Sequence, residues 1–288
     1  MDSDLIRRVG FAVVAIPLAF LLVWYGGVPL ALLLATAAVL ATGELFALAR
    51  RVDIRPAAGL GLLSAAAVAP LTYVALASPR ASELAAAAWP FAAALWLLGL
   101  LTWALAARPP GARPLEAVGV TTFAVAYTGA LPAFLLVIRH AQLPQRNWAG
   151  AWLVFFPLVV TWVCDTAAMF GGRVFGGPKL APTISPGKTR SGAIAGVVGG
   201  LAVAPLFCWV IFPRVGVEVS GWQLLAIAGV LSMVGQAGDL AESLFKRQAG
   251  VKDSSNLIPG HGGVLDRLDS LYFVIPVAAA MYRAMGLI

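Results

Sequence analysis

Long apolar runs with almost no charge constrain this sequence more than any other feature. About 20 apolar residues are enough for a helix to cross the hydrocarbon core of a bilayer, and such runs recur along most of the chain. With 60% hydrophobic and 11% charged residues, the chain has too little charge to cover the surface of a soluble domain. The runs lack the alternation typical of outer-membrane strands. The sequence therefore predicts an all-α, polytopic membrane bundle.

Nine membrane-spanning helices are expected, with boundaries accurate to a few residues. Prolines inside several of them do not exclude helix, because membrane helices tolerate kinks. The short, charged start leads into an apolar segment without a small-residue cleavage site, so we expect a retained first helix. The predicted spans are residues 9–25, 27–49, 57–77, 83–107, 115–138, 150–172, 192–213, 221–245 and 264–286.

The basic residues predict an orientation. Lys and Arg total 20 against 13 Asp and Glu, a net charge of +7. In a membrane protein this excess concerns topology first, because cytoplasmic loops retain Lys and Arg, so we infer no nucleic-acid partner. With the N-terminus inside, 15 of the 20 basic residues fall in cytoplasmic segments and the other 5 outside. We therefore expect a cytoplasmic N-terminus and, after nine spans, an extracytoplasmic C-terminus.

The two halves of the chain differ in intramembrane charge. Residues 1–160 hold almost none, and Glu44 and Glu116 near span ends are the nearest exceptions. The acids of the C-terminal half are Asp165, Asp239, Glu242, Asp253, Asp266 and Asp269. Without a visible repeat or linker, we expect a single integral membrane domain over 1–288, with N-terminal helices in 1–150 and the catalytic helices and cytoplasmic loops in 151–288.

The densest polar cluster lies at the end of the eighth predicted span and the start of the ninth. Asp239, Glu242 and Lys246 share one helix face by their i, i+3, i+7 spacing, and Asp266 and Asp269 are likewise i, i+3. A loop joins the two helix ends, so these carboxylates can converge. A hard cation such as Mg²⁺ would relieve their repulsion. The alternative is that the acids cap helices or pair with neighbouring Lys and Arg.

Two glycine-containing segments offer donors for phosphate. His261-Gly-Gly263 precedes the last span, where backbone amides can approach an anion, although a flexible turn is the alternative. Ser185-Pro-Gly-Lys-Thr-Arg-Ser-Gly192 lacks the spacing and preceding strand of a Walker motif. Its Lys188, Thr189 and Arg190 still suit a triphosphate, against the alternative of a solvated loop.

Asp165 is a separate signal, a carboxylate in the middle of the sixth predicted span. An acid at that depth is costly and needs a partner. A metal ion or a basic, headgroup-binding residue is the leading candidate.

These residues resemble the signature of the phosphatidate cytidylyltransferases, also called CDP-diacylglycerol synthases. The match spans about 27 residues, with Ser243-Leu-Phe-Lys246-Arg247, Lys252-Asp253, Ser255, Ile258-Pro259, His261-Gly-Gly263 and Asp266-Arg267-Leu-Asp269. Upstream, Ser185-Pro-Gly-Lys188-Thr189 resembles a second family motif, and Asp165 falls where the family has an intramembrane Asp. Ser191 stands where that motif has Glu. The first five spans are only loosely similar.

The resemblance implies that CTP and phosphatidic acid give CDP-diacylglycerol and pyrophosphate. It implies Mg²⁺ held by Asp239 and Asp266, to which we add Asp165, and a second, monovalent cation such as K⁺. It also implies a homodimer in the bacterial inner membrane, in contact with membrane lipid. The expected catalytic residues are Asp239, Asp266, Lys246 and Asp269. The expected substrate-binding residues are Ser185, Lys188, Thr189, Ser243, Arg247, Lys252, His261, Gly262, Gly263 and Arg267.

Other functions stay open on the sequence alone. A CTP-dependent transferase of an ether lipid or a polyprenyl substrate would use the same polar residues, because the apolar walls that read lipid tails are not decoded by sequence. A transporter is less favoured, because transporters often show inverted repeats and this chain shows none. A scaffold would not require clustered acids and bases.

Overall fold

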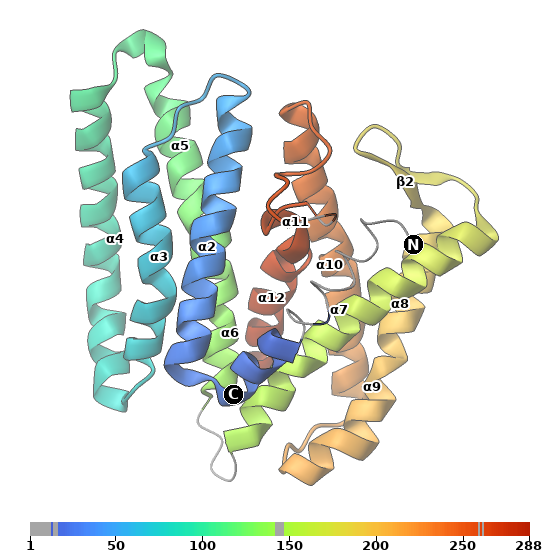
Figure 1. Cartoon of the computed structure of the whole chain (residues 1–288). Coiled ribbons are helices and arrows are strands. Elements are labelled where there is room, and N and C mark those ends of the chain that lie inside the picture. The colour runs from blue at the N-terminus through green and yellow to red at the C-terminus, as the bar shows by residue number, and fades with distance from the viewer. Residues whose placement is uncertain (1–12, 14–16, 142–146, 259, 261) are drawn as a thin grey trace. The chain divides into compact units, whose positions relative to one another are not determined.

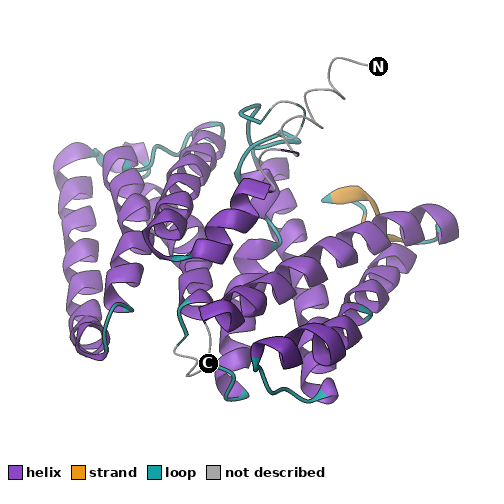
Figure 2. Cartoon of the chain, turned by 60° about the horizontal axis from the view of Figure 1, so that its bottom comes forward, coloured by secondary structure: helices purple, strands orange, loops and turns teal. Residues whose placement is uncertain are grey.

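The computed structural model describes residues 13, 17–141, 147–258, 260 and 262–288, and its regular structure is almost entirely helical (Figures 1 and 2). Two short antiparallel strands, β1 (Lys179–Ala181) and β2 (Ser185–Thr189), form a hairpin. The helices are α2 (Gly27–Arg50), α3 (Ala58–Ala75), α4 (Pro79–Ala107), η1 (Pro110–Ala112), α5 (Pro114–Ala124), η2 (Val125–Ala130), α6 (Leu131–Arg139), α7 (Asn147–Phe175), α8 (Arg190–Leu201), α9 (Val203–Leu206), η3 (Phe207–Ile211), η4 (Phe212–Val215), α10 (Gly221–Gln248), α11 (Leu265–Leu268) and α12 (Leu271–Ala284).

Seven helical segments within the described residues are long and apolar enough to cross a membrane. They coincide with the second to eighth predicted spans, which confirms an all-α, multi-pass membrane protein. The seven segments are Gly27–Arg50, Ala58–Ala75, Pro79–Ala107, Pro110–Arg139, Trp148–Phe175, Arg190–Val215 and Gly221–Gln248.

The first and ninth predicted spans have a different outcome. Residues 17–25 are helical, but most of the rest of the first span lies outside the described residues. The ninth is broken after α11, and its longer part, α12, has 14 residues, fewer than the roughly 20 that a perpendicular span needs. The count of nine and the sides of the two termini therefore stay predictions.

The chain divides into two compact units. The first comprises Met1–Val137 and Gln248–Arg267, so the loop that follows α10 belongs with the N-terminal helices. The second comprises Ile138–Arg247 and Leu268–Ile288. Whether the whole chain behaves as a single membrane domain stays a prediction.

Helices α2 to α5 form the body of the first unit (Figure 1). Small residues permit their close packing. A Cβ on Gly61 of α3 would overlap the ring of Phe46 on α2. A buried hydrogen bond of 2.6 Å joins the hydroxyls of Thr42 on α2 and Thr128 in η2. Since a buried hydroxyl without a partner is costly, this pair fixes how α2 meets η2.

In the second unit α7 packs against α8 (Figure 1). A Cβ on Gly196 would lie 3.1 Å from the carbonyl oxygen of Cys164, and one on Gly200 would overlap the hydroxyl of Ser232 on α10. The glycines of α8 therefore serve close helix packing, as their sequence suggests. Beside them, Phe207 stacks edge-on against Phe156, with 5.0 Å between the ring centroids.

Candidate functional site

The predicted site residues are divided between the two units, and the structure brings together those within each unit. The first unit holds Lys252, Gly262, Gly263, Asp266 and Arg267. The second unit holds Asp165, Ser185, Lys188, Thr189, Asp239, Ser243, Lys246, Arg247 and Asp269. His261 lies outside the described residues, so its predicted role is not tested.

Three acids gather in the second unit. Asp239 of α10 interacts electrostatically with Asp165 of α7 and with Asp269, which precedes α12. The close approach of Asp269 to α10 depends on Gly238, because an added Cβ there would lie 2.8 Å from the backbone oxygen of Asp269. Asp165 is exposed, and Asp239 and Asp269 are half-buried. The mutual repulsion of these acids favours the approach of a positive charge.

Lys188 supplies a positive charge to this group. Its Nζ lies 2.5 Å from Oδ2 of Asp239, with 27% of the Lys188 side chain and 30% of the Asp239 side chain exposed. The β1–β2 hairpin carries Lys188 to this position. The adjacent Thr189 caps α8, because its Oγ1 accepts a hydrogen bond of 3.1 Å from the backbone N–H of Gly192. The hairpin and α8 are thereby joined with Lys188 directed at α10.

Ser191, which replaces the family's Glu, is turned toward the hairpin. Its Oγ donates to the backbone oxygen of Gly176 and lies 3.1 Å from Oγ1 of Thr189. The hydroxyl therefore helps to hold the base of the hairpin.

Two further predicted residues lie near the hairpin or beside Asp239. Arg247, at the end of α10, donates from Nε to the backbone oxygen of Ile184 at 3.0 Å, next to the half-buried Ser185. Ser243 lies one turn after Asp239 and donates from Oγ to its Oδ1 at 3.4 Å. Residues that the sequence assigned to substrate binding thus surround the hairpin and one face of α10.

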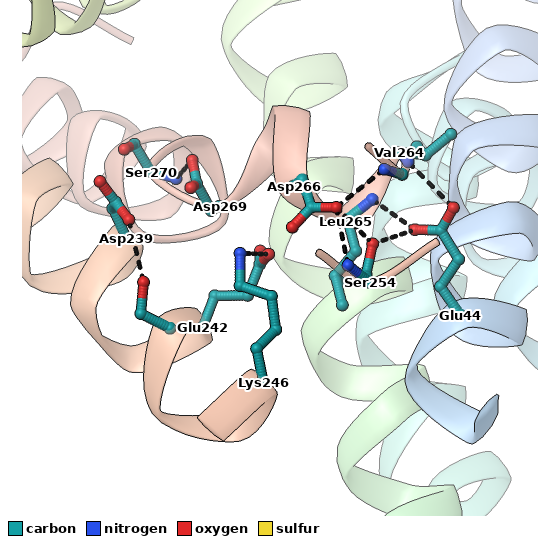
Figure 3. A network of polar contacts seen from close by, with 12 residues as sticks. Glu44, Asp239, Glu242, Lys246, Ser254, Val264, Leu265, Asp266, Asp269 and Ser270 are labelled. Atoms are coloured by element: carbon teal, nitrogen blue, oxygen red, sulfur yellow. Dashed lines mark hydrogen bonds and ion pairs between the residues drawn. The ribbon is translucent and has the colours of Figure 1, made fainter. Parts of the chain in front are cut away.

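Lys246 forms a buried ion pair with Glu242 (Figure 3). Nζ of Lys246 lies 3.0 Å from Oε1 of Glu242, whose side chain is 0% exposed. An uncompensated charge at such a position is strongly destabilising, so each partner requires the other. For Glu242 the pairing alternative raised from the sequence is therefore the observed one. Lys246 also interacts electrostatically with Asp269. It therefore lies close to one of the three acids in the group formed by Asp165, Asp239 and Asp269.

In the first unit, Asp266 holds the segment that runs from the end of α10 (Gln248) to the start of α11 (Leu265). This segment carries much of the family signature and is called the signature loop below. Oδ2 of Asp266 accepts hydrogen bonds of 2.8 Å from the backbone N–H groups of Ser254 and Gly263. The Ser254 hydroxyl also lies 2.8 Å from Oδ2, and it shares its one proton between Asp266 and Glu44. Gly262 has a φ of +84°, a left-handed conformation that favours glycine, and a Cβ there would lie 2.6 Å from the same Oδ2. Asp266 therefore requires the glycine pair beside it. Lys252 and Arg267 are exposed on this segment.

Glu44 of α2 is a site residue that the sequence did not assign. It is only 7% exposed, and four groups of the loop lie within hydrogen-bonding distance of its carboxylate. Ser254, Val264 and Leu265 are seen beside it in Figure 3. The donors are Ser255 Oγ at 2.7 Å, Leu265 N at 2.8 Å, Ser254 Oγ at 3.0 Å and Val264 N at 3.0 Å. The sequence signal was weak, an acid near the end of an apolar span, because its partners lie more than 200 residues away.

The predicted metal ligands have suitable chemistry but are not gathered into one cluster. Among the described residues, no group of three or more His, Cys, Asp or Glu side chains is placed to hold a metal ion. Asp165 and Asp239 belong to the second unit and Asp266 to the first. Mg²⁺ usually takes one or two carboxylates, several waters and substrate phosphates. The Asp165–Asp239 group offers oxygen ligands of this kind, so it fits the ion's preference.

Comparison with known proteins places these features in a family. The profile of the cytidylyltransferase family matches residues 6–285. Phosphatidate cytidylyltransferase from Brucella suis is 51% identical over 137 residues, 46% of each chain, and that from Haemophilus influenzae is 42% identical over 154 residues, 52% of each. The protein of that name from Pseudomonas aeruginosa is 40% identical over 202 residues, 68% of this chain and 71% of that one. The aligned part of the chain spans about half the length of the first two relatives.

Proposed function

We infer that this chain, which belongs to the cytidylyltransferase family, joins CTP to phosphatidic acid and releases pyrophosphate. The family match over residues 6–285 supports transfer of a cytidylyl group as the reaction. The name that the relatives share, phosphatidate cytidylyltransferase, supports phosphatidic acid as the lipid substrate. The lysine and carboxylates of the second unit, with the glycine-containing loop of the first, supply the polar groups that such a reaction needs.

The reaction needs charge neutralisation more than it needs a base. A phosphate oxygen of phosphatidic acid attacks the α-phosphorus of CTP and forms a new P–O bond. The bond between the α-phosphorus and the bridging oxygen breaks, and pyrophosphate leaves with that electron pair. Because the second pKa of a phosphomonoester is about 6, the attacking oxygen is already anionic at neutral pH. The enzyme has to position two anions and balance the charge that develops between them.

The basic residues of the chain suit this task. Lys188 forms an ion pair with Asp239, which holds its side chain in place before substrate binds. Its ammonium group can then exchange this carboxylate for a CTP phosphate. Arg247 is anchored to the same hairpin. The backbone N–H of Gly262 would complement a phosphate of the lipid or of CTP. That of Gly263, also proposed to bind substrate, is bound to Asp266 and would have to exchange this partner for a phosphate. The other proposed substrate-binding residues are Ser185, Thr189, Ser243, Lys252, His261 and Arg267.

Asp239, Asp266 and Asp165 are the residues that we propose to hold Mg²⁺, with a monovalent cation such as K⁺ nearby. A bound Mg²⁺ would neutralise phosphate charge and orient the leaving pyrophosphate. Lys246 and Asp269 complete the proposed catalytic set. Their electrostatic contact, together with the buried Glu242 partner of Lys246, supports a fixed charge arrangement at this end of α10.

The test is an assay of purified protein in detergent with CTP labelled in the α-phosphate. Label should become lipid-extractable with phosphatidic acid and Mg²⁺ and should remain water-soluble when EDTA replaces Mg²⁺. Parallel reactions with an ether-linked phosphatidic acid and with a polyprenyl phosphate decide between lipid classes. Labelling of the polyprenyl phosphate alone would show that the chain acts on that lipid and not on phosphatidic acid. The absence of any labelled lipid would contradict a cytidylyltransferase function.

We also propose that the chain lies in the bacterial inner membrane with its N-terminus in the cytoplasm and its C-terminus outside, and that it is a homodimer. The 15 to 5 division of basic residues supports the orientation. A reporter fused after Ile288 should read as extracytoplasmic and one inserted near residue 180 as cytoplasmic. The same side for both would contradict nine spans. Light scattering of the detergent-solubilised protein measures the dimer.

A further inference from the structure

Glu44 holds a loop that is distant in sequence. The Ser255 hydroxyl and the backbone amides of Val264 and Leu265 donate to its carboxylate, and the single proton of the Ser254 hydroxyl is shared between Glu44 and Asp266, at sequence separations from Glu44 of 210 to 221 residues. We propose that Glu44 is a positioning residue, which fixes the signature loop so that Gly262, Gly263 and Asp266 are presented to substrate. Its catalytic consequence rests on the proposed function, whereas its hold on the loop does not.

The arrangement of donors requires a carboxylate at position 44. Oε1 accepts from Ser255 Oγ and Val264 N, and Oε2 accepts from Ser254 Oγ and Leu265 N. A hydroxyl can rotate and accept instead, but a backbone N–H can only donate. A glutamine amide turned either way would place its NH₂ group against one backbone N–H. Glu44→Gln therefore preserves size and still leaves at least one buried donor without an acceptor.

Glu44 also acts on Asp266 through a shared serine. Ser254 Oγ lies 3.0 Å from Oε2 of Glu44 and 2.8 Å from Oδ2 of Asp266. The chain Glu44–Ser254–Asp266 thereby links α2 to a proposed metal ligand. Displacement of Ser254 removes a donor from Asp266 and alters its orientation.

The glycine of the signature is fitted to this carboxylate. A Cβ on Gly263 would overlap Oε2 and Cδ of Glu44 and the hydroxyl of Ser254. The loop backbone consequently approaches Glu44 as closely as sterics allow. This contact gives a physical reason for the second glycine of the His-Gly-Gly motif in this chain.

The test compares Glu44→Gln with Glu116→Gln, a matched change in the same unit. Glu116 has a side chain that is 43% exposed and pairs with Arg113 at the surface, away from the loop contacts. Hydrogen exchange of peptides covering residues 254–266 should accelerate at least tenfold in Glu44→Gln, by a roughly 1.4 kcal/mol easier opening, and should be unchanged in Glu116→Gln. The kcat per folded molecule should fall about 10²-fold in Glu44→Gln, since a misplacement of about 1 Å costs that much.

The kinetic readout separates positioning from mere stability. A structural role alone would lower the folded yield and the unfolding temperature while leaving kcat per folded molecule unchanged, and that result would overturn the proposal. Should Glu44→Gln fail to fold, Ser255→Ala removes one donor to Oε1 and should give faster exchange and a smaller fall in kcat. Wild-type kcat in Ser255→Ala, with wild-type exchange, would also overturn it.

Failure of the proposed function gives a different pattern. A wild-type protein without any cytidylyltransferase activity would overturn the function, while the exchange experiment would still measure the hold of Glu44 on the loop. An active wild-type protein together with an equally active Glu44→Gln would overturn only the positioning role.

Discussion

The carboxylates of the two units are satisfied in contrasting ways. In the first unit Glu44 and Asp266 are each 7% exposed and are bound by hydroxyls and backbone amides. In the second unit Asp239 is held by the side chain of Lys188, and 30% of its own side chain is exposed. Backbone amides cannot move away from a carboxylate unless the loop unfolds. The flexible side chain of a lysine can instead rotate from the carboxylate to a phosphate. The first arrangement suits a framework and the second suits an exchangeable binding site.

The same contrast separates loss of activity from loss of stability. An exposed or half-exposed ion pair contributes about 0–1 kcal/mol, because solvent screens it. A buried acceptor that serves several donors is worth more, because its removal strands each donor. Substitutions in the two units should therefore change activity and unfolding in different proportions.

The largest expected effect is that of Asp239→Asn on activity. Loss of the charge should reduce kcat/KM at least 10²- to 10³-fold, the range seen when one transition-state donor is lost. Stability should change by less than about 1 kcal/mol. A Mg²⁺ titration of activity at fixed CTP measures the fall in kcat/KM, and thermal unfolding measures the change in stability. Asp253→Asn, at an exposed position, is the control. Near-normal activity with an unchanged Mg²⁺ dependence would direct attention to Asp165 and Asp269.

Asp266→Asn should reduce activity about as much and should also destabilise the protein. The three donors on Oδ2 would face a neutral amide oxygen at best, so we expect a loss of about 1–3 kcal/mol. The comparison of unfolding temperatures with Asp239→Asn is the decisive measurement. Equal stability of the two variants would mean that the two carboxylates do not differ in the way their contacts indicate.

Gly263→Ala tests the close contact of the first unit. The new methyl group would overlap Glu44 and Ser254, and we expect a destabilisation of about 1–3 kcal/mol together with faster proteolysis of the loop. Gly119→Ala on α5 is the matched control, since a Cβ there meets nothing within 4 Å. In a helix interior that change should stabilise slightly, by about 0.5–1 kcal/mol. Two variants of equal stability would contradict the packing of Glu44 against the loop.

The most selective effect is expected for Lys188→Ala, and it should fall on one substrate. Loss of a charge-assisted hydrogen bond to phosphate costs about 1.5–3 kcal/mol, so KM for CTP should rise about tenfold or more. KM for phosphatidic acid should change less. Lys179→Ala, an exposed lysine of the same hairpin, is the control. An equal rise in both KM values would mean that Lys188 attracts both anionic substrates and does not bind CTP specifically.

The sequence predicted most helices because apolar length is a local property. Seven spans follow from runs of apolar residues alone. The break before α12 was missed, because Asp269 and Ser270 interrupt the helix without a proline or glycine at that point.

The candidate site was predictable in part. Residue type and spacing identified Asp239 and Lys188 separately, but their 2.5 Å contact depends on how the hairpin folds back on α10. Glu44 could not be assigned, because hydrogen bonds across more than 200 residues leave no local pattern. The partnership of Lys246 with Glu242 was visible as i, i+4 spacing, whereas its complete burial was not.

The distance in sequence between Glu44 and its partners has a consequence for biogenesis. A ribosome adds about 5–20 residues per second, so Glu44 is made about 10–40 s before Ser254, which lies 210 residues further on. During that interval the carboxylate has none of its loop donors, and an unpaired charge is costly within a bilayer. The nascent helix is therefore expected to keep this end at the aqueous surface. The contacts that hold Glu44 in the folded protein can form only after Ser254, Ser255, Val264 and Leu265 have been made.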